Sequence, residues 1–214
     1  YAEILLNPQA VLEGDTDSPD AKYAELYKQF TNQEYLQVIT GTEENISKFT
    51  GDPIVPKLEL LKANAIGRIQ GYTAFEEALN YVALNYPNNP EGKKAKEIIA
   101  DQLPKLAESE FLEANASKKA ENWKLVFPFK SGDSQKAEDL KIALEKAIKD
   151  LKYRNTVSID VYDLENNFVV VHGFKSDEFT LGFAELIKNN KDYRIANENF
   201  VILSSNYQIL QVHK

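Results

Sequence analysis

The sequence contains neither cysteine nor methionine, and only two of its 214 residues are histidine. The absence of cysteine excludes a disulfide framework, a thiolate zinc site and a cysteine nucleophile. No apolar run approaches the roughly 20 residues that a helix needs to span a bilayer. The nine glycines are scattered and form no Gly-x-Gly-x-x-Gly phosphate loop. The usual motifs of redox, zinc-thiolate and dinucleotide-binding proteins are therefore absent.

Positive charge is also scarce, because 25 Lys and Arg residues stand against 33 Asp and Glu residues, a formal charge of −8. A net acidic chain repels phosphate backbones, and a nucleic acid partner is therefore not expected. Hydrophobic residues make up 43% of the chain, enough for the core of one large or two small domains. The chain opens at Tyr1 inside an apolar pattern, which indicates a fragment of a longer protein.

Helical periodicity dominates the first half of the chain. Residues 1–12 are interpreted as the end of a helical hairpin, and the polar residues 14–20 as a break that offers a cap to the next helix. That helix is predicted because apolar side chains follow at i, i+3, i+4 and i+7, namely Tyr23, Leu26, Tyr27 and Phe30. Further helices are predicted over residues 33–48, 55–70 and 73–85, with Leu36 among the inward residues of the first of these.

Three landmarks of these helices recur at one offset. Tyr35 and Tyr72 open the second helix of a hairpin (72 − 35 = 37), and Phe49 and Tyr86 close it (86 − 49 = 37). Proline starts the next hairpin at residues 53 and 90, again 37 apart. A fixed offset predicts an internal repeat of two helices that stack into a solenoid over residues 1–106. A plain helical bundle is the alternative.

After residue 106 the pattern changes. Residues 107–122 are rich in Glu, Lys, Ala and Ser and are interpreted as a linker or polar helix. Residues 123–214 then predict a small α+β domain of order β-α-β-β-α-β-β, with both helices on one face of the sheet. Its last two strands are predicted as a hairpin, residues 199–204 and 207–213, around Ser205 and Asn206. This order is that of a ferredoxin-like sandwich with an extra strand.

Few residues suggest chemistry. His172 and His213 lie in apolar strands, where a histidine is more often packed than catalytic; a hydrolase using His172 with Asp160 or Asp163 is the weaker alternative. The oxygen-rich residues 15–20 lack the glycine and the distal glutamate of a calcium loop, which favours a capped turn. We expect no catalytic residues, no metal site and no cofactor.

One polar stripe is a candidate partner-binding site. Lys57, Asn64 and Arg68 are spaced at i, i+7 and i+11, which places them on one side of the helix predicted over residues 55–70. The first helices of stacked hairpins line a concave groove, and this stripe would suit an acidic or carboxylate-bearing peptide. A solvated helix face is the simpler alternative.

The motif Tyr-Pro-Asn-Asn-Pro at residues 86–90, followed by Ala95, resembles a tetratricopeptide repeat. The whole chain resembles the C-terminal part of the SprE/PorW family of Bacteroidetes lipoproteins. The likeness is carried by Tyr-Ala-Glu-Ile-Leu-Leu-Asn-Pro at residues 1–8, Asn-Gln-Glu-Tyr-Leu-Gln-Val-Ile at residues 32–39 and Ile-Leu-Ser-Ser-Asn-Tyr-Gln-Ile-Leu-Gln-Val-His-Lys at residues 202–214.

This resemblance implies a periplasmic protein of type IX secretion and gliding motility, anchored to the outer membrane by a lipid on an N-terminal cysteine upstream of the sequence. It also implies protein partners from the secretion and motility complex and no catalytic residues. The expected function is therefore a non-enzymatic adaptor or scaffold module. The alternative is a module that binds peptidoglycan glycan strands on an open, aromatic-lined face of the sheet.

Overall fold

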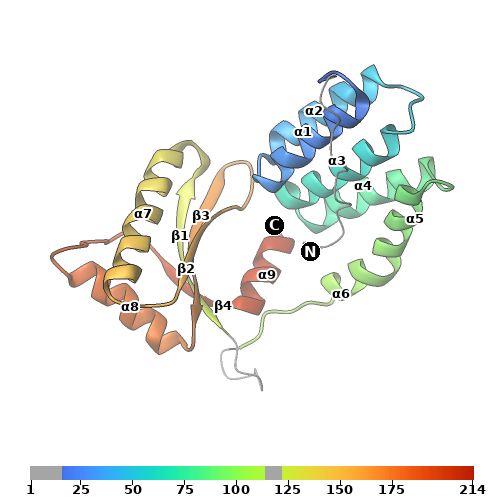
Figure 1. The fold of residues 1–214 in the computed structure, drawn as a ribbon. Helices are drawn as coiled ribbons and strands as arrows, with labels where there is room; N and C mark the ends of the chain where they lie inside the picture. Colours follow the sequence, from blue (N-terminus) through green and yellow to red (C-terminus); the bar gives the residue numbers. More distant parts are fainter. Residues whose placement is uncertain (1–15, 114–121) are drawn as a thin grey trace. The chain divides into compact units, whose positions relative to one another are not determined.

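The computed structural model describes residues 16–113 and 122–214, so the hairpin end predicted at residues 1–12 lies outside the described residues. The chain forms two compact units, Tyr1–Ala107 and Glu108–Lys214. Each unit has its own core, and each is treated by itself below. Figure 1 shows the course of the chain through both.

Unit 1 is entirely helical in its described part (Figure 1). Two hairpins follow one another, and a long interrupted helix packs against the second. The elements are α1 (Pro19–Thr31), α2 (Tyr35–Lys48), α3 (Val55–Gln70), α4 (Tyr72–Asn85), α5 (Pro90–Glu97), the π-helical segment η1 (Ile98–Gln102) and α6 (Leu103–Ala107). The bounds of α3 are those predicted from the sequence.

Local signals place the ends of these helices. The hydroxyl of Ser18 accepts a hydrogen bond from the Ala21 backbone N–H at 3.3 Å, and Pro19 occupies the first turn of α1. The cap predicted for residues 14–20 is thus confirmed. The repeat landmarks also fall on helix ends, because α2 and α4 begin at Tyr35 and Tyr72 and are followed by Phe49 and Tyr86 as their C-caps.

The inward face of α2 differs from the prediction at Leu36, whereas α3 buries one continuous apolar face. On α3, the buried side chains include Leu58, Leu61, Ala65 and Ile69. On α2, Leu36 was expected to face inward and is instead 54% exposed, because the helix buries Tyr35, Val38 and Thr42. The hydroxyl of Thr42 donates to the Val38 carbonyl at 2.7 Å, which satisfies it inside the core and lets a polar residue occupy an inward position.

A proline explains the π-helical segment between α5 and α6. Pro104 lacks a backbone N–H and its ring would clash with the carbonyl four residues earlier in a regular α-helix. At the residue immediately before this proline, the N–H of Leu103 bonds to the carbonyl of Ile98, five residues back. The wider turn carries the helix past the proline, and Ile98 and Leu103 both stay buried in the core.

Unit 2 contains a four-stranded antiparallel sheet with helices. Its elements are β1 (Trp123–Lys130), the 3₁₀ turn η2 (Ser131–Asp133), α7 (Ser134–Asp150), β2 (Thr156–Val161), β3 (Asn166–Phe174), α8 (Asp177–Asn189), β4 (Phe200–Leu203) and α9 (Ser204–Val212). The strands lie in the order β2-β3-β1-β4. Ser176 caps α8 by accepting a hydrogen bond from the Phe179 N–H.

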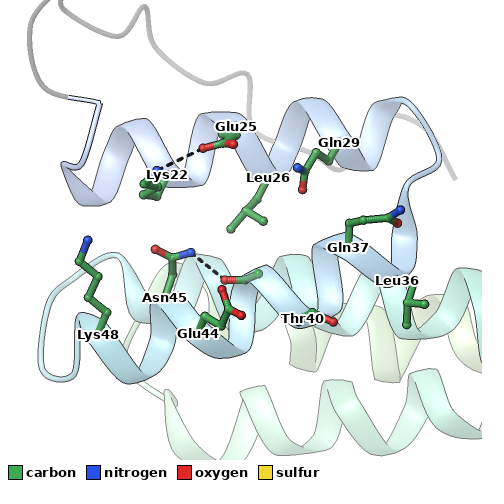
Figure 2. A pocket seen from close by; sticks show the side chains of 11 residues that line it. Lys22, Glu25, Leu26, Gln29, Leu36, Gln37, Thr40, Glu44, Asn45 and Lys48 are labelled. Atoms are coloured by element: carbon green, nitrogen blue, oxygen red, sulfur yellow. Dashed lines mark hydrogen bonds and ion pairs between the residues drawn. The ribbon is translucent and has the colours of Figure 1, made fainter.

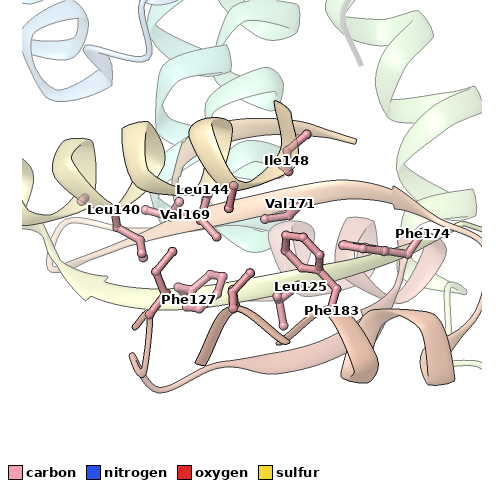
Figure 3. Packing of buried hydrophobic residues seen from close by; sticks show 13 residues of the cluster. Leu125, Phe127, Leu140, Leu144, Ile148, Val169, Val171, Phe174 and Phe183 are labelled. Carbon is pink, nitrogen blue, oxygen red and sulfur yellow. The ribbon is translucent and has the colours of Figure 1, made fainter. Parts of the chain in front are cut away.

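One face of the sheet packs against α7 and α8, which confirms that these two helices cover the same face. Alternate residues of the central strands point into this core, namely Leu125, Phe127, Val169 and Val171. They meet Leu140, Leu144 and Ile148 of α7, and Phe183 of α8 (Figure 3). Because Trp123 also packs against this cluster, the single tryptophan reports on unit 2.

The predicted C-terminal hairpin is wrong: residues after Leu203 form helix α9, not a fifth strand. The intervening positions of the central strands, Val126, Phe168 and Val170, are buried and apolar on the second face of the sheet. In α9, Tyr207 and Leu210 are one turn apart and pack together on this face. The apolar residues after Leu203 alternate as they would in a strand. The segment forms a helix instead, because as α9 it covers the apolar second face of the sheet.

Candidate functional site

A groove of about 640 Å³ runs between the antiparallel helices α1 and α2 of unit 1 (Figure 2). Its floor is formed where Gly41 faces Leu26. A Cβ atom on Gly41 would lie 2.5 Å from Leu26 Cδ2, so a larger residue at this position would require the Leu26 side chain to move. The groove walls are mostly polar, which distinguishes the groove from the buried contacts between successive helices.

Two lysines stand at one end of this groove, Lys22 from α1 and Lys48 from α2. Oδ1 of Asp17, in the turn before α1, lies 3.6 Å from the Nζ atoms of both. One carboxylate oxygen therefore bridges the two ammonium groups. These distances exceed the roughly 2.7–2.9 Å of a strong charge-assisted hydrogen bond, so the bridge is loose.

The middle of the groove offers amide and carboxylate groups. Asn45 donates from Nδ2 to the Gly41 carbonyl at 2.7 Å, which fixes one wall (Figure 2). Glu25 and Glu44 line the same stretch. The Oε1 atom of Gln29 is buried here, and no hydrogen-bond partner for it occurs in the part of the chain that the structure describes. A buried amide oxygen without a donor is unfavourable, and Gln29 would have to turn its side chain outward for a group in the groove to reach this oxygen.

The opposite end of the groove is apolar. Leu36 lies there beside Gln37, at the start of α2, and is 54% exposed. The groove thus runs from two cations, through acceptor groups, to one aliphatic side chain. This sequence of chemistries matches a short peptide segment better than a small metabolite, because its features are spread along the length of the helices.

The three residues of the predicted stripe all lie on α3 and are all half-buried: Lys57, Asn64 and Arg68. They share one side of the helix, but none of them lines the groove between α1 and α2. Asn64 uses its Nδ2 to donate to the Leu60 carbonyl at 2.7 Å, inside its own helix. The three residues therefore form one face of α3, while the groove lies between α1 and α2.

Unit 2 gathers its polar side chains on the second face of the sheet, beneath α9. Nζ of Lys124 lies 2.7 Å from Nδ1 of His172, and Oγ of Ser158 lies 2.7 Å from Nε2 of the same ring. Ser158 also donates to Oδ1 of Asp160, and the Tyr207 hydroxyl donates to Oδ2, both at 2.7 Å. The hydrogen bonds thus run without interruption from Lys124 through His172, Ser158 and Asp160 to Tyr207.

The direction of each hydrogen bond follows from what each group can donate. An ammonium group only donates, so Nδ1 of His172 accepts from Lys124 and the ring proton lies on Nε2. Nε2 then donates to Ser158, whose own proton goes to Asp160. Ser158 is therefore a link in a satisfied network and is not deprotonated by His172, as a nucleophile would need to be.

Burial lowers the pKa of His172, and the nearby Lys124 lowers it further, while Asp160 acts in the opposite direction. Burial also lowers the pKa of Lys124. For Tyr207, burial and then the Asp160 carboxylate raise the pKa. At neutral pH the histidine is therefore neutral and the tyrosine protonated, the states in which the network closes.

The acid–base pair considered from the sequence differs from this arrangement. In the hydrogen bonds described here, His172 reaches Asp160 only through Ser158. Oδ1 of Asp163 instead accepts from the backbone N–H groups of Glu165 and Asn166 and closes the β2–β3 turn. The sequence signal for Ser158 was its place two residues before Asp160 in an alternating strand, which puts both on one face.

The described residues contain neither a metal-ligand cluster nor a membrane-spanning helix. Among residues 16–113 and 122–214, no group of three or more His, Asp or Glu side chains is arranged to hold a metal ion. Within the same residues, no helix has both the length and the apolar character needed to cross a bilayer.

The structure thus defines a class: a helical-hairpin unit with a polar groove, followed by a unit with an antiparallel sheet. Comparison with known proteins adds no family to this description. No family model matches the chain, and no curated protein matches it.

Proposed function

We propose that the chain is a non-enzymatic adaptor module whose α1–α2 groove binds a peptide segment of a partner protein. The observation that carries this proposal is the groove of about 640 Å³, whose walls carry side-chain donors and acceptors that include Gln37, Glu44 and Lys48. A peptide backbone supplies N–H and C=O groups at regular intervals, and these can pair with such side chains. The groove is long and polar, as suits an extended segment.

We further propose that unit 1 is a tetratricopeptide-like stack. Support comes from the two successive hairpins, from second helices that begin at Tyr35 and Tyr72, and from close helix contact at glycine. A Cβ on Gly67 would lie 2.8 Å from the ring of Phe75 in the partner helix. Repeats of this kind stack by burying the apolar face that one hairpin cannot bury alone.

For unit 2 we propose a ferredoxin-like fold with an added C-terminal helix. The element order up to β4 is β-α-β-β-α-β, and the sheet order β2-β3-β1-β4 suits two interleaved β-α-β halves. Both faces of this sheet are covered, one by α7 and α8 and the other by α9. An open aromatic face, on which the glycan-binding alternative depended, is not favoured by this arrangement.

The cellular setting of the proposal rests on the resemblance of residues 1–8, 32–39 and 202–214 to the SprE/PorW family. On that basis we propose a periplasmic module, lipid-anchored at the outer membrane through a part of the protein that precedes this sequence. Its partners would be proteins of the type IX secretion and gliding machinery.

The test is site-specific photocrosslinking in a Bacteroidetes host. A photoreactive residue at Gln37, inside the groove, should yield a discrete crosslink to a secretion or motility protein. The same residue at Lys28, which is exposed on α1 but does not line the groove, is the matched control. Equal crosslinking at both positions, or none at Gln37, would contradict the proposal.

A further inference from the structure

We propose that α9 is an acid-sensitive latch that shortens the tether between the two units. The tether is the chain that leads from Ala107 to the first fixed point of unit 2. While α9 is docked on the sheet, its first turn fixes the chain at Leu112. When α9 undocks, the free chain extends to the start of β1 at Trp123. The latch lies wholly within unit 2 and operates whatever the α1–α2 groove binds.

The first turn of α9 holds the chain on both sides of residues 113–121. The side chain of Asn206 accepts from the Leu112 N–H and donates to the Leu112 carbonyl, both at 2.8 Å. The N–H of Ser204 donates to the Asn122 carbonyl at 2.9 Å. Leu112 and Asn122 are therefore attached to the same helical turn, although they are ten residues apart in the sequence (122 − 112 = 10).

These contacts are polar, so they can break without disturbing the core of the unit. Leu112 is 40% exposed and its neighbour Phe111 is 58% exposed, so apolar burial holds this segment only weakly. The amide of Asn206 is half-buried, and water can replace its two hydrogen bonds. The attachment of Leu112 thus depends on α9 holding Asn206 in position.

The helix α9 depends in turn on its contact with the sheet. It has nine residues, fewer than the roughly 12–15 that an isolated helix needs in water. Tyr207 is its buried residue, and it packs with Leu210 on the second face of the sheet. Loss of that contact would unfold the helix and displace Asn206. The docking of α9 and the attachment of Leu112 are therefore one equilibrium.

Release of the latch lengthens the tether about threefold. Unit 1 ends at Ala107, so five residue steps lead to Leu112 (112 − 107 = 5) and sixteen lead to Trp123 (123 − 107 = 16). At about 3.4 Å per residue, the extended tether spans roughly 17 Å with the latch closed and roughly 54 Å with it open. The latch thus limits how far the two units can separate.

The ring of His172 makes the latch sensitive to acid. It belongs to the hydrogen bonds that run from Lys124 to Tyr207 beneath α9. Protonation of its Nδ1 would remove the acceptor that lies 2.7 Å from Nζ of Lys124 and would place two cations in contact. That Nζ also lies 5.4 Å from the centre of the Tyr207 ring, so displacement of the lysine disturbs the residue that anchors α9.

The charged groups around His172 give the direction of the effect. On this face β1 contributes Lys124, β2 contributes Asp160 and α9 contributes Tyr207, whereas β4 has no titratable residue. Burial, and then Lys124, lower the pKa of His172, while Asp160 raises it. Undocking of α9 reduces the burial, so proton uptake favours the open latch. The latch therefore opens as the pH falls below about 6.5, the ordinary pKa of histidine.

Distances between two spin labels measure the length of the tether. Because the chain has no cysteine, Glu77→Cys in α4 and Lys146→Cys in α7, both at exposed positions, provide one pair of labels. At about pH 7.5, Asn206→Ala should broaden the distance distribution measured by pulsed electron resonance and lengthen its mean by about 10 Å, as expected when a flexible chain grows from five to sixteen residues. Gln208→Ala, an exposed change on the same helix, is the matched control and should leave the distribution unchanged.

The same labels test the effect of acid at about pH 5, where Asp and Glu, with ordinary pKa values of about 4, remain mostly ionised. The labelled parent chain should then approach the distribution of Asn206→Ala. His172→Gln should keep the distribution found at neutral pH, whereas His213→Gln should respond to acid as the parent does. Emission from Trp123 shows in each sample whether the core of unit 2 is still folded.

Longer distances for Asn206→Ala, together with an acid response that His172→Gln abolishes, support the latch. Equal distributions for Asn206→Ala and Gln208→Ala overturn it. An acid response that is absent from the parent, or that survives in His172→Gln, overturns it too. So does altered Trp123 emission of the parent at about pH 5, because the whole unit would then open. The crosslink at Gln37 is independent of these outcomes, so the latch and the peptide-binding groove are tested separately.

Discussion

Tyr207 of α9 donates its hydroxyl proton to Oδ2 of Asp160 in β2 at 2.7 Å. This bond ties the C-terminal helix to an edge strand of the sheet. The Tyr207 hydroxyl oxygen also accepts a hydrogen bond from Nε2 of Gln211 at 3.0 Å. Because Tyr207 is buried, the carboxylate would have no equivalent donor at that position if the hydroxyl were removed.

Tyr207→Phe should therefore destabilise unit 2 by about 2 kcal/mol, the usual cost of losing a buried hydrogen bond to a charged group. Denaturant unfolding followed by Trp123 fluorescence measures this unit alone. Tyr153→Phe is the control, since that ring packs on Phe183 at the other face of the sheet. An unchanged midpoint for Tyr207→Phe would show that the bond contributes nothing to folding.

The stability of unit 2 should fall as the pH is lowered below about 6.5, the ordinary pKa of histidine. The pKa of His172 is lowered by burial and by Lys124, so the unfolded chain binds a proton at a higher pH than the folded chain. The stabilisation is complete above the unfolded pKa and is lost as the pH falls through the folded pKa.

His172→Gln should remove this part of the pH dependence, because glutamine can bond to Lys124 and Ser158 without titrating. The measurement is the unfolding free energy of both proteins at a series of pH values between neutrality and mild acid. His213→Gln, which changes the other histidine, is the matched control. Parallel curves for His172→Gln and the unsubstituted chain would refute the assignment.

Two helical glycines should respond to alanine with opposite signs. At Gly67 a Cβ would lie 2.8 Å from the ring of Phe75, so Gly67→Ala should destabilise unit 1 by about 1–3 kcal/mol through overcrowding. At Gly182 in α8, no described atom outside the local helix backbone lies within 4 Å of the added Cβ, so Gly182→Ala should stabilise unit 2 by about 0.5–1 kcal/mol through helix propensity. Scanning calorimetry of each variant measures both changes, and two shifts of the same sign would contradict the packing.

Asn206 holds the segment around Leu112 at the beginning of unit 2. Its side chain accepts from the Leu112 N–H and donates to the Leu112 carbonyl, both at 2.8 Å. Asn206→Ala should therefore accelerate hydrogen exchange at the Leu112 amide, with little effect on the amides of the central strands. Gln208→Ala, an exposed change on the same helix, should leave Leu112 protected as before. Equal exchange at Leu112 in the two variants would count against the contact.

Local sequence determined most helix and strand positions, because caps and periodicity act over a few residues. Ser18 lies in the predicted cap of residues 14–20 and starts α1, and the apolar spacing of α3 gives its bounds and its buried face. The polar stripe on α3 was also readable from spacing. The groove was not, because it depends on how α1 packs against α2 and on Leu36 facing outward.

The tertiary structure alone decided the C-terminal segment and the polar network. Residues from Ser204 onward carry an apolar pattern that suits a strand and a helix alike, and the apolar second face formed by Val126 and Val170 selects the helix. The same packing brings Tyr207 to Asp160, which is 47 residues earlier in the sequence. Sequence periodicity fixes which side of an element is apolar, but it does not say which distant element will cover that side.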